Sequence, residues 1–305
     1  MNKVLAIIGP TGIGKTNLAV RLARRFNGEI VNADSRQIYR HMNIGTAKPS
    51  QEELSLVQHH LFDIIEPDRE FSLAEYQHLA YGAIEAIQMC NKLPLLVGGS
   101  GLYVWAVLEG WVIPAVPPDI DFRKSLEQKA AEGGADELYQ ELKKRDPIAA
   151  VKIDPHNVRR VIRALEVNKD AIIPFSALRK KKPPQFQSLI IGLTADRKEL
   201  YHQVDERVDA MVKRGFVGEV QKLLGMDYNS NLPSMFSIGY REIGQYLQGE
   251  MTLAEALYKI KVGTHRFIRH QYAWFRLKDE RIKWFDVADM DEKVIEKTVA
   301  DFLKN

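Results

Sequence analysis

The run from Gly9 to Thr16, with the sequence GPTGIGKT, has the composition of a loop that binds phosphate. An apolar run over 4–8 precedes it, and a segment of helical periodicity over 17–23 follows it. A glycine-rich turn between a strand and a helix lets several backbone N–H groups converge on one anion, and the helix dipole favours negative charge there. Lys15 would add a mobile cation, and Thr16 a hydroxyl ligand for Mg²⁺. We therefore predict a phosphate site made of Gly9, Pro10, Thr11, Gly12, Ile13, Gly14, Lys15 and Thr16.

The loop leaves two questions open. The same residues also suit a plain glycine-rich turn at the start of a helix, and the loop does not say whether the phosphate belongs to a nucleotide.

An aspartate, Asp34, follows the second predicted strand, which covers 29–31. In a parallel α/β sheet the carboxyl ends of the strands line the ligand crevice, so we expect Asp34 at the same sheet edge as the phosphate loop. A carboxylate there can cap a helix, bind a metal or act as a general base. Position alone does not choose among these roles.

The next predicted strand, over 93–97, ends in Gly98-Gly99-Ser100-Gly101. In a P-loop NTPase an aspartate at the end of a nearby strand holds Mg²⁺. No acidic residue stands between Leu93 and Val107, which weakens the interpretation as an ATPase.

The composition is that of a globular protein without a strong charge. The chain has 305 residues, 43 basic and 40 acidic side chains and a net charge of +3, so any argument for a nucleic-acid partner rests on local clusters. The single Cys90 excludes an intramolecular disulfide framework, and we expect it to pack rather than to act in catalysis. No apolar run is long enough to span a bilayer, and we expect no signal peptide and a cytoplasmic location.

A helical insertion is predicted in the middle of the chain. Three prolines stand between Pro114 and Pro118, and strand signals are rare from there to about Lys182. We expect helices over 121–132 and 135–144 and from Pro155 onward, and hence a core domain of 1–115 plus 185–305 and an insertion domain of 116–184.

After a further strand at 189–193, the C-terminal part is predicted to be mostly helical, with apolar spacing over 200–224 and a capping box at Thr252 that opens a helix to about Phe275. On that last helix one face is basic, through Lys259, Arg266, Arg269 and Arg276, and the other, which includes Trp274, is expected in the core. The basic face suits either plain solvation, a membrane surface or contact with a polyanion. We interpret His41, His59 and His60 as surface or packing residues.

Seven short motifs, in this order and spacing, resemble those of the tRNA dimethylallyltransferases, also called tRNA isopentenyltransferases. The resemblance covers nearly the whole chain, and the motifs are 9–16, Asp34-Ser-Arg-Gln37, Gly45-Thr-Ala-Lys48, 97–103, Arg163-Ala-Leu-Glu166, Ile238-Gly-Tyr-Arg241 and Gln271-Tyr-Ala-Trp274.

The resemblance implies a fold, an activity and a set of site residues. The fold would be a P-loop NTPase-like parallel sheet flanked by helices, with an all-helical insertion that binds the tRNA anticodon stem-loop. The reaction would transfer a dimethylallyl group from dimethylallyl pyrophosphate to N6 of adenosine 37, with Asp34 as general base, Lys15 neutralising the leaving group and Thr16 binding Mg²⁺. Arg241 would contact phosphate or the tRNA backbone. Further tRNA contacts would come from Asp34, Ser35, Arg36, Gln37, Ser100, Arg123, Arg159, Arg160, Val161, Ile162 and Arg163. We expect a monomer; the alternatives are a small-molecule kinase of the P-loop class, an adenylate isopentenyltransferase and a protein that binds without turnover.

Overall fold

The computed structural model describes residues 2–113, 119–170, 175–176 and 181–304. The chain forms two compact units, a core of Met1–Leu108 with Pro184–Asn305 and an insertion of Glu109–Pro183. The first division precedes the expected boundary at 116, and the second adjoins the expected boundary at 184. The proline-rich stretch at 114–118 lies outside the described residues.

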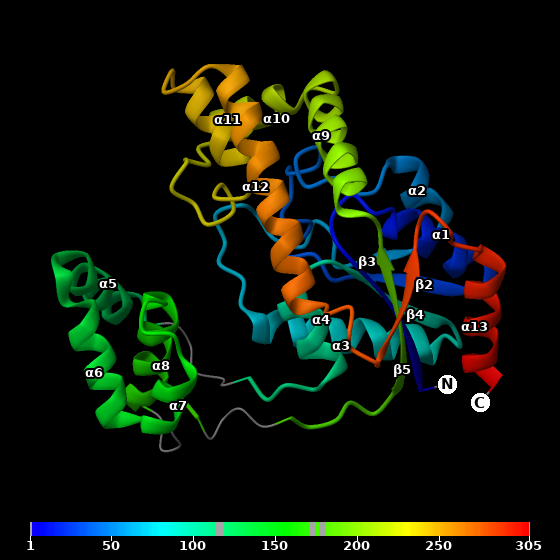
Figure 1. Ribbon diagram of the computed structural model, residues 1–305, viewed down its shortest axis with the longest axis horizontal. Helices are drawn as coiled ribbons and strands as arrows, with labels where there is room; N and C mark the ends of the chain where they lie inside the picture. The colour runs from blue at the N-terminus through cyan, green and yellow to red at the C-terminus, as the bar shows by residue number, and fades with distance from the viewer. Residues whose placement is uncertain (1, 114–118, 171–174, 177–180, 305) are drawn as a thin grey trace. The chain divides into compact units, whose positions relative to one another are not determined.

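A parallel sheet of six strands organises the core (Figure 1). The strands lie in the order β3-β2-β4-β1-β5-β6. Their bounds are β1 Lys3–Ile8, β2 Gly28–Asn32, β3 His59–His60, β4 Leu93–Gly98, β5 Gln187–Thr194 and β6 Ile282–Asp286. The four predicted strands are confirmed as β1, β2, β4 and β5, while the two edge strands β3 and β6 were not predicted.

Helices cover both faces of this sheet, as the apolar runs of parallel strands require. On one face α1 (Lys15–Arg25) contacts β2 and β4 and shares an apolar cluster with α13 (Glu292–Lys304). On the other, α3 (Leu73–Met89) contacts β2, β4 and α4 (Gly101–Leu108). Successive side chains of β1 point to opposite faces of the sheet. From Val4 to Ile8 these apolar side chains have no exposed surface. The core is therefore a three-layer α/β structure.

A second apolar cluster joins the C-terminal helices, whose bounds are α9 Arg197–Lys213, α10 Phe216–Gly225, α11 Tyr240–Leu247 and α12 Leu253–Trp274. The expected helical segment over 200–224 is two helices, because Gly215 adopts a left-handed φ of 97° between them. The capping box at Thr252 is confirmed. Lys259, Arg266 and Arg269 of α12 are exposed, as is Arg276 beyond its end. Trp274 is 43% exposed, so its predicted place in the core is wrong.

The insertion contains α5 Ile120–Lys129, a wide turn at Ala130–Gly134, α6 Ala135–Arg145, α7 Pro147–Lys152 and α8 Val158–Asp170. The third predicted helix begins at Val158 rather than at Pro155, because 154–157 form a turn in which Asn157 accepts a hydrogen bond from the Arg160 N–H at 3.2 Å. The chain enters and leaves the insertion through paired segments, since the Lys182 N–H donates to the Gly110 carbonyl at 2.7 Å and Trp111 bridges Lys181.

Two smaller expectations have clear outcomes. Cys90 is exposed, so the prediction that it packs is wrong. Among the described residues, none of the helices has the length and apolarity needed to cross a bilayer.

Candidate active site

The loop between β1 and α1 has the backbone conformation that its glycines permit. Gly9 has a φ of 146°, and a Cβ there would lie 2.6 Å from the Leu193 carbonyl oxygen of β5. Gly14 precedes α1 with a left-handed φ of 90°. The loop therefore turns tightly against the sheet and presents the amino end of α1, where an anion is stabilised by unpaired N–H groups and the helix dipole.

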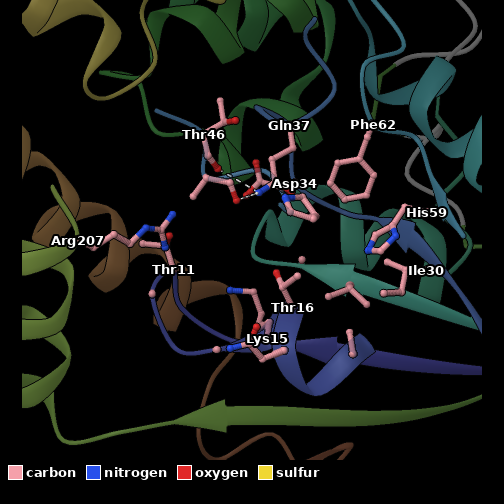
Figure 2. A pocket seen from close by; sticks show the side chains of 18 residues that line it. Thr11, Lys15, Thr16, Ile30, Asp34, Gln37, Thr46, His59, Phe62 and Arg207 are labelled. Atoms are coloured by element: carbon pink, nitrogen blue, oxygen red, sulfur yellow. Dashed lines mark hydrogen bonds between the residues drawn. The ribbon is translucent and has the colours of Figure 1, made fainter. Parts of the chain in front are cut away.

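This loop forms the floor of a cavity of about 210 Å³ (Figure 2). Side chains from five parts of the core surround it: Lys15 and Thr16 of α1, Asp34 after β2, Thr46 of the following loop, His59 of β3 and Arg207 of α9. A second cavity of about 200 Å³, lined mainly by apolar side chains of α9 to α12, shares Thr11, Asp34, Thr46 and Arg207 with it. The shared residues mark the place where the cavity at the loop meets a more apolar one.

Asp34 is held at the end of β2 by the residue two positions before it. The side chain of Asn32 accepts from the Asp34 N–H at 2.9 Å and donates to the carbonyls of Asp34 and Leu61. The Tyr76 hydroxyl donates to the Asn32 carbonyl at 3.0 Å. One oxygen of Asp34 then accepts the Arg36 N–H at 2.8 Å. The carboxylate is thus fixed with an oxygen facing the cavity, in the position that the strand order predicts (Figure 2).

Two cations face Asp34 across the cavity, Lys15 and Arg207. Burial lowers the pKa of Lys15 to about 8; Asp34 acts in the opposite direction and Arg207 adds to the lowering. Burial also lowers the pKa of Arg207, against the attraction of Asp34. Lys15 Nζ donates to the Pro10 carbonyl at 2.7 Å. A cavity that buries two cations beside one carboxylate favours an anionic ligand.

Gln271 of α12 joins the loop to the end of β4. Its Oε1 accepts from the Thr11 N–H at 2.8 Å, and its Nε2 donates to the Gly99 carbonyl at 3.0 Å. Since the Thr11 N–H already has a partner, the N–H groups left for phosphate are those after it in the loop. A Cβ at position 99 would lie 2.2 Å from Gln271 Nε2, so the contact requires the glycine that stands there.

A carboxylate outside the cavity, Glu219 of α10, shapes the loop that carries Thr46. It accepts the backbone N–H groups of Asn43, Ile44 and Gly45 at 2.8–3.1 Å and the hydroxyl of Tyr240 at 2.6 Å. From the other side, Gln37 Nε2 donates to the carbonyls of Thr46 and Ala47 at 3.1 and 3.0 Å. Gln37 therefore positions the cavity wall.

Ser35 and Ser100 meet beside Asp34. The Ser35 N–H donates to Ser100 Oγ at 2.9 Å, and the two hydroxyls are 3.3 Å apart. The Arg36 side chain extends away from the cavity floor, and its Nη1 donates to the Pro233 carbonyl at 3.2 Å. The structure thus brings four predicted residues, Asp34, Ser35, Arg36 and Ser100, to the carboxyl ends of β2 and β4.

Arg241 is not brought to the site. It does not line either cavity formed by the described residues, and its guanidinium donates to Glu242 Oε1 at 3.0 and 2.6 Å. Arg207, which belongs to none of the sequence motifs, lines the cavity instead.

In the insertion, the predicted tRNA-binding residues separate into two groups. Arg123 and Arg163 both pair with the buried carboxylate of Glu166, whose pKa they lower although burial acts to raise it. The side chains of Val161 and Ile162 are 1% and 2% exposed in the apolar interior, so their prediction as contact side chains is wrong. Arg159 and Arg160 lie exposed on α8.

The donor set at the loop suits a hydrated Mg²⁺. Within the described parts of the chain there is no cluster of three His, Cys, Asp or Glu side chains that could hold a metal ion. Mg²⁺ is commonly bound by one or two protein oxygens together with substrate phosphates and waters, so a threonine hydroxyl facing an anion site fits it. Thr16 provides that hydroxyl, with the Asp34 carboxylate in the same cavity.

Arg207 and His59 line the cavity although the sequence assigns neither of them to the site. Arg207 is one of several charged residues on a long helix, and only the packing of α9 beside the loop reveals it. The sequence favours a surface or packing role for His59, whereas the structure places it in the cavity wall next to Phe62.

Comparison with known proteins agrees with this architecture. The family model "IPP transferase" matches residues 37–278, and "Isopentenyl transferase" matches residues 2–65. The tRNA dimethylallyltransferase of Dehalococcoides mccartyi is 49% identical over 300 residues, which are 98% of this chain and 92% of the relative. That of Roseiflexus castenholzii is 52% identical over 276 residues, 90% of each protein.

Solved structures give the same answer. The crystal structure of the full-length tRNA isopentenylpyrophosphate transferase of Bacillus halodurans has a TM-score of 0.72 and 40% identity, covering 100% of this chain and 96% of that one. A eukaryotic dimethylallyltransferase acting on tRNA has a TM-score of 0.85 and 26% identity, covering 100% and 80%. The fold is that of these P-loop NTPase-like enzymes, and the chain belongs to the tRNA dimethylallyltransferase family.

Proposed function

We propose that this protein transfers a dimethylallyl group from dimethylallyl pyrophosphate to N6 of adenosine 37, beside the anticodon of tRNA. The observation that carries the proposal is the cavity that the phosphate loop shares with Asp34, which Lys15 and Arg207 also line. The strand β4 ends at Gly98, and no carboxylate stands between Leu93 and Val107. This arrangement suits a phosphate that departs with the developing charge rather than one that is attacked by water.

The pyrophosphate end of the donor is assigned to the loop. The N–H groups from Gly12 to Thr16 lie at the amino end of α1, and Lys15 adds a cation. Arg207 replaces Arg241 as the second cation, because it lines the cavity. The apolar second cavity, which begins where the first one ends, would receive the hydrocarbon part.

Asp34 is assigned as the general base. The lone pair of the adenine N6 amine is delocalised into the ring, so removing its proton assists attack. As the bond from N6 to C1 of the dimethylallyl group forms, the bond from C1 to the pyrophosphate oxygen breaks, and the N6 proton moves to the Asp34 carboxylate. The charge that develops on the leaving group is stabilised by Lys15, Arg207 and the loop.

Mg²⁺ is the proposed cofactor, with Thr16 as its protein ligand. When bound, it would neutralise part of the pyrophosphate charge.

The proposed tRNA contacts are drawn from exposed residues around this site and on the insertion. Ser35, Arg36 and Ser100 lie beside Asp34, where the target base must arrive after leaving its stack. Arg159 and Arg160 are the proposed phosphate contacts of the insertion. Lys259, Arg266 and Arg269 form an exposed basic face on α12, and Arg276 is exposed just beyond its end. Arg123 and Arg163 pair with Glu166 but keep 31% of each side chain exposed, and we propose them as further tRNA contacts. We place the protein in the cytoplasm as a monomer.

The test is an incubation with Mg²⁺, labelled dimethylallyl pyrophosphate and either unmodified tRNA or AMP. We expect label on tRNA and none on AMP. Label on AMP alone would assign the protein as an adenylate isopentenyltransferase. Phosphoryl transfer from ATP without prenylation would assign it as a P-loop kinase, and binding without either product as a binding protein.

A further inference from the structure

One face of α9 leads from the phosphate loop into the second cavity. The four α9 residues that line this cavity are Val204, Arg207, Val208 and Met211. Val204 packs on the loop, since a Cβ on Gly12 would lie 2.6 Å from Val204 Cγ1. Arg207 comes next and also lines the first cavity. The helix therefore places a cation beside the pyrophosphate site and apolar side chains one turn further on.

The helix α12 forms another wall of this cavity and lies beside α9 (Figure 1). Two polar contacts outside the cavity join the helices. His265 Nε2 lies 2.9 Å from Asp205 Oδ1, and Lys261 Nζ lies 2.8 Å from Asp209 Oδ1. These contacts hold the spacing of the two helices, so the width of the cavity is fixed.

The buried end of the cavity is formed by Met211 and Phe216, which are 7% and 1% exposed and belong to the same apolar cluster. A Cβ on Gly45 or on Gly239 would lie under 3.0 Å from the Phe216 ring, and Tyr240 packs against its edge with centroids 5.1 Å apart. The Phe216 ring is thus wedged between two backbone segments and cannot turn aside. Any extra space at this end has to come from Met211.

The spacing on α9 can be compared with the length of a prenyl chain. Arg207 and Met211 are four residues apart, which is about 6 Å along the helix axis. The dimethylallyl chain spans three bonds from C1 to its terminal methyl group, or about 4 Å, as between consecutive Cα atoms. A second five-carbon unit adds four more bonds and would carry the chain past Met211.

The volume of the cavity leads to the same limit. An apolar cavity of about 150 Å³ binds benzene, which corresponds to about 25 Å³ per carbon. On this scale five carbons need about 125 Å³ and ten carbons about 250 Å³. The second cavity, at about 200 Å³, accommodates the first chain and not the second.

We infer that Met211 is a specificity-determining residue, whose side chain limits the donor to one five-carbon unit by occupying the place that a second unit would need. The inference rests on the proposed function for the assignment of the hydrocarbon to the second cavity. Replacing Met211 by alanine removes three heavy atoms, about 75 Å³ on the same scale, which brings the volume to what ten carbons require.

Two control variants accompany Met211→Ala. Met235→Ala makes the same deletion at a side chain that is 1% exposed and belongs to the same apolar cluster. Met235 does not line either cavity formed by the described residues. Met211→Leu keeps nearly the same volume at the same position.

The measurement is calorimetric binding of dimethylallyl, geranyl and inorganic pyrophosphate with Mg²⁺ and without tRNA. We expect the ratio of the geranyl to the dimethylallyl dissociation constant to fall by about 10- to 100-fold in Met211→Ala, since each buried methylene is worth about fourfold in affinity and space for about three is made. Inorganic pyrophosphate should bind unchanged, and both controls should keep the wild-type ratio. An unchanged ratio in Met211→Ala, or the same fall in Met235→Ala, would overturn the inference.

A second measurement needs no variant, so it also decides the case in which Met211→Ala does not fold. For unbranched alkyl pyrophosphates of three to twelve carbons, the affinity of the wild type should rise to about six to eight carbons, where the cavity is full, and fall at ten. The cavity has an open side at Phe236, which is 51% exposed. A chain that leaves through this side would keep or raise the affinity at ten carbons, and that result would refute the length limit.

Both experiments are independent of transfer to tRNA. If the length limit appears but tRNA is not prenylated, the proposed function is lost and the inference stands. If tRNA is prenylated but the ratio does not respond to Met211→Ala, only the inference is lost.

Discussion

The Thr11 N–H and the Gln271 side chain, 260 residues apart in the sequence, form a hydrogen bond of 2.8 Å. Through its second contact, to the Gly99 carbonyl, Gln271 connects the phosphate loop with the end of β4. The amide can do this because it donates and accepts at the same time. The shape of the loop therefore depends on α12 as well as on its own glycines.

Replacing this amide should weaken both the fold and the site. Gln271→Ala leaves the Thr11 N–H and the Gly99 carbonyl without partners, and we expect a loss of about 1–3 kcal/mol in the free energy of unfolding. Pyrophosphate affinity should fall with it. Denaturant unfolding and calorimetry measure the two effects, with Gln248→Ala as the exposed control. If the two variants unfold alike, Gln271 does not hold the loop.

Asp34→Asn should separate chemistry from binding. An asparagine oxygen still accepts the Arg36 N–H, so the turn persists, but the base is lost. We expect transfer to fall by about 10²–10⁴-fold with pyrophosphate binding nearly intact. Single-turnover kinetics and equilibrium binding test this, with the exposed Asp68→Asn as control. A comparable loss of pyrophosphate binding would assign Asp34 to the phosphate or metal site.

The affinity for pyrophosphate should depend on pH through Lys15. Burial lowers the pKa of Lys15 to about 8, so the free protein loses this charge as the pH rises through 8. Above that pH, Lys15 must take up a proton when pyrophosphate binds, and this uptake weakens the affinity. The ratio of dissociation constants for Lys15→Met and the wild type cancels the titration of the ligand itself. We expect it to be large and constant below pH 7.5 and to fall above pH 8. A ratio that stays constant to pH 9.5 would contradict the prediction.

Arg207 should contribute to anion binding although no motif contains it. We expect Arg207→Ala to weaken pyrophosphate binding on the order of 10- to 100-fold, since a hydrogen bond to a charged group contributes about 1.5–3 kcal/mol. Arg207→Lys should recover only part of the affinity, because lysine keeps the positive charge but lacks the bidentate geometry of the guanidinium. Arg197→Ala, at the exposed start of α9, is the control. Unchanged affinity in Arg207→Ala would return the phosphate role to another cation.

The exposed arginines of α8 should report on RNA contact. If Arg159 and Arg160 each neutralise one phosphate, the double alanine variant should weaken tRNA binding and reduce the slope of log affinity against log salt by about 0.7–0.9 per contact. Stability should change by less than about 0.5 kcal/mol, because both side chains are exposed. The control is the double variant in which Lys143 and Lys144, both exposed on α6, are replaced by alanine, because it removes the same charge. Equal salt slopes for the two double variants would make Arg159 and Arg160 ordinary surface residues.

The central sheet is predictable from the sequence because four of its strands are apolar runs bounded by turn signals. The edge strands give no such signal. β3 has only two residues, both half-buried, and β6 mixes Ile282 with exposed Lys283 and Asp286. Their pairing depends on neighbours that the chain supplies elsewhere, so a local pattern does not contain it.

The site divides in the same way. The phosphate loop and Asp34 are predictable because each follows a strand, and parallel strands end at one sheet edge. Arg207 becomes visible only when α9 packs beside the loop. Arg241 belongs to a motif but pairs with its neighbour Glu242, an interaction that a motif does not reveal. Likewise, the run Arg159–Arg163 is basic in sequence, whereas on the helix Val161 and Ile162 face the interior.

The paired segments at the base of the insertion have a consequence for how the chain folds. Once the Lys182 N–H bonds to the Gly110 carbonyl, the ends of a long excursion between β4 and β5 are already close together. The chain entropy that must be lost to bring these two ends together is then lost when the insertion forms. The pairing of β5 with β1 therefore costs no more than it would after a short connection. Each unit has an apolar cluster of its own, so a chain interrupted by the insertion can still bring its central strands together as neighbours.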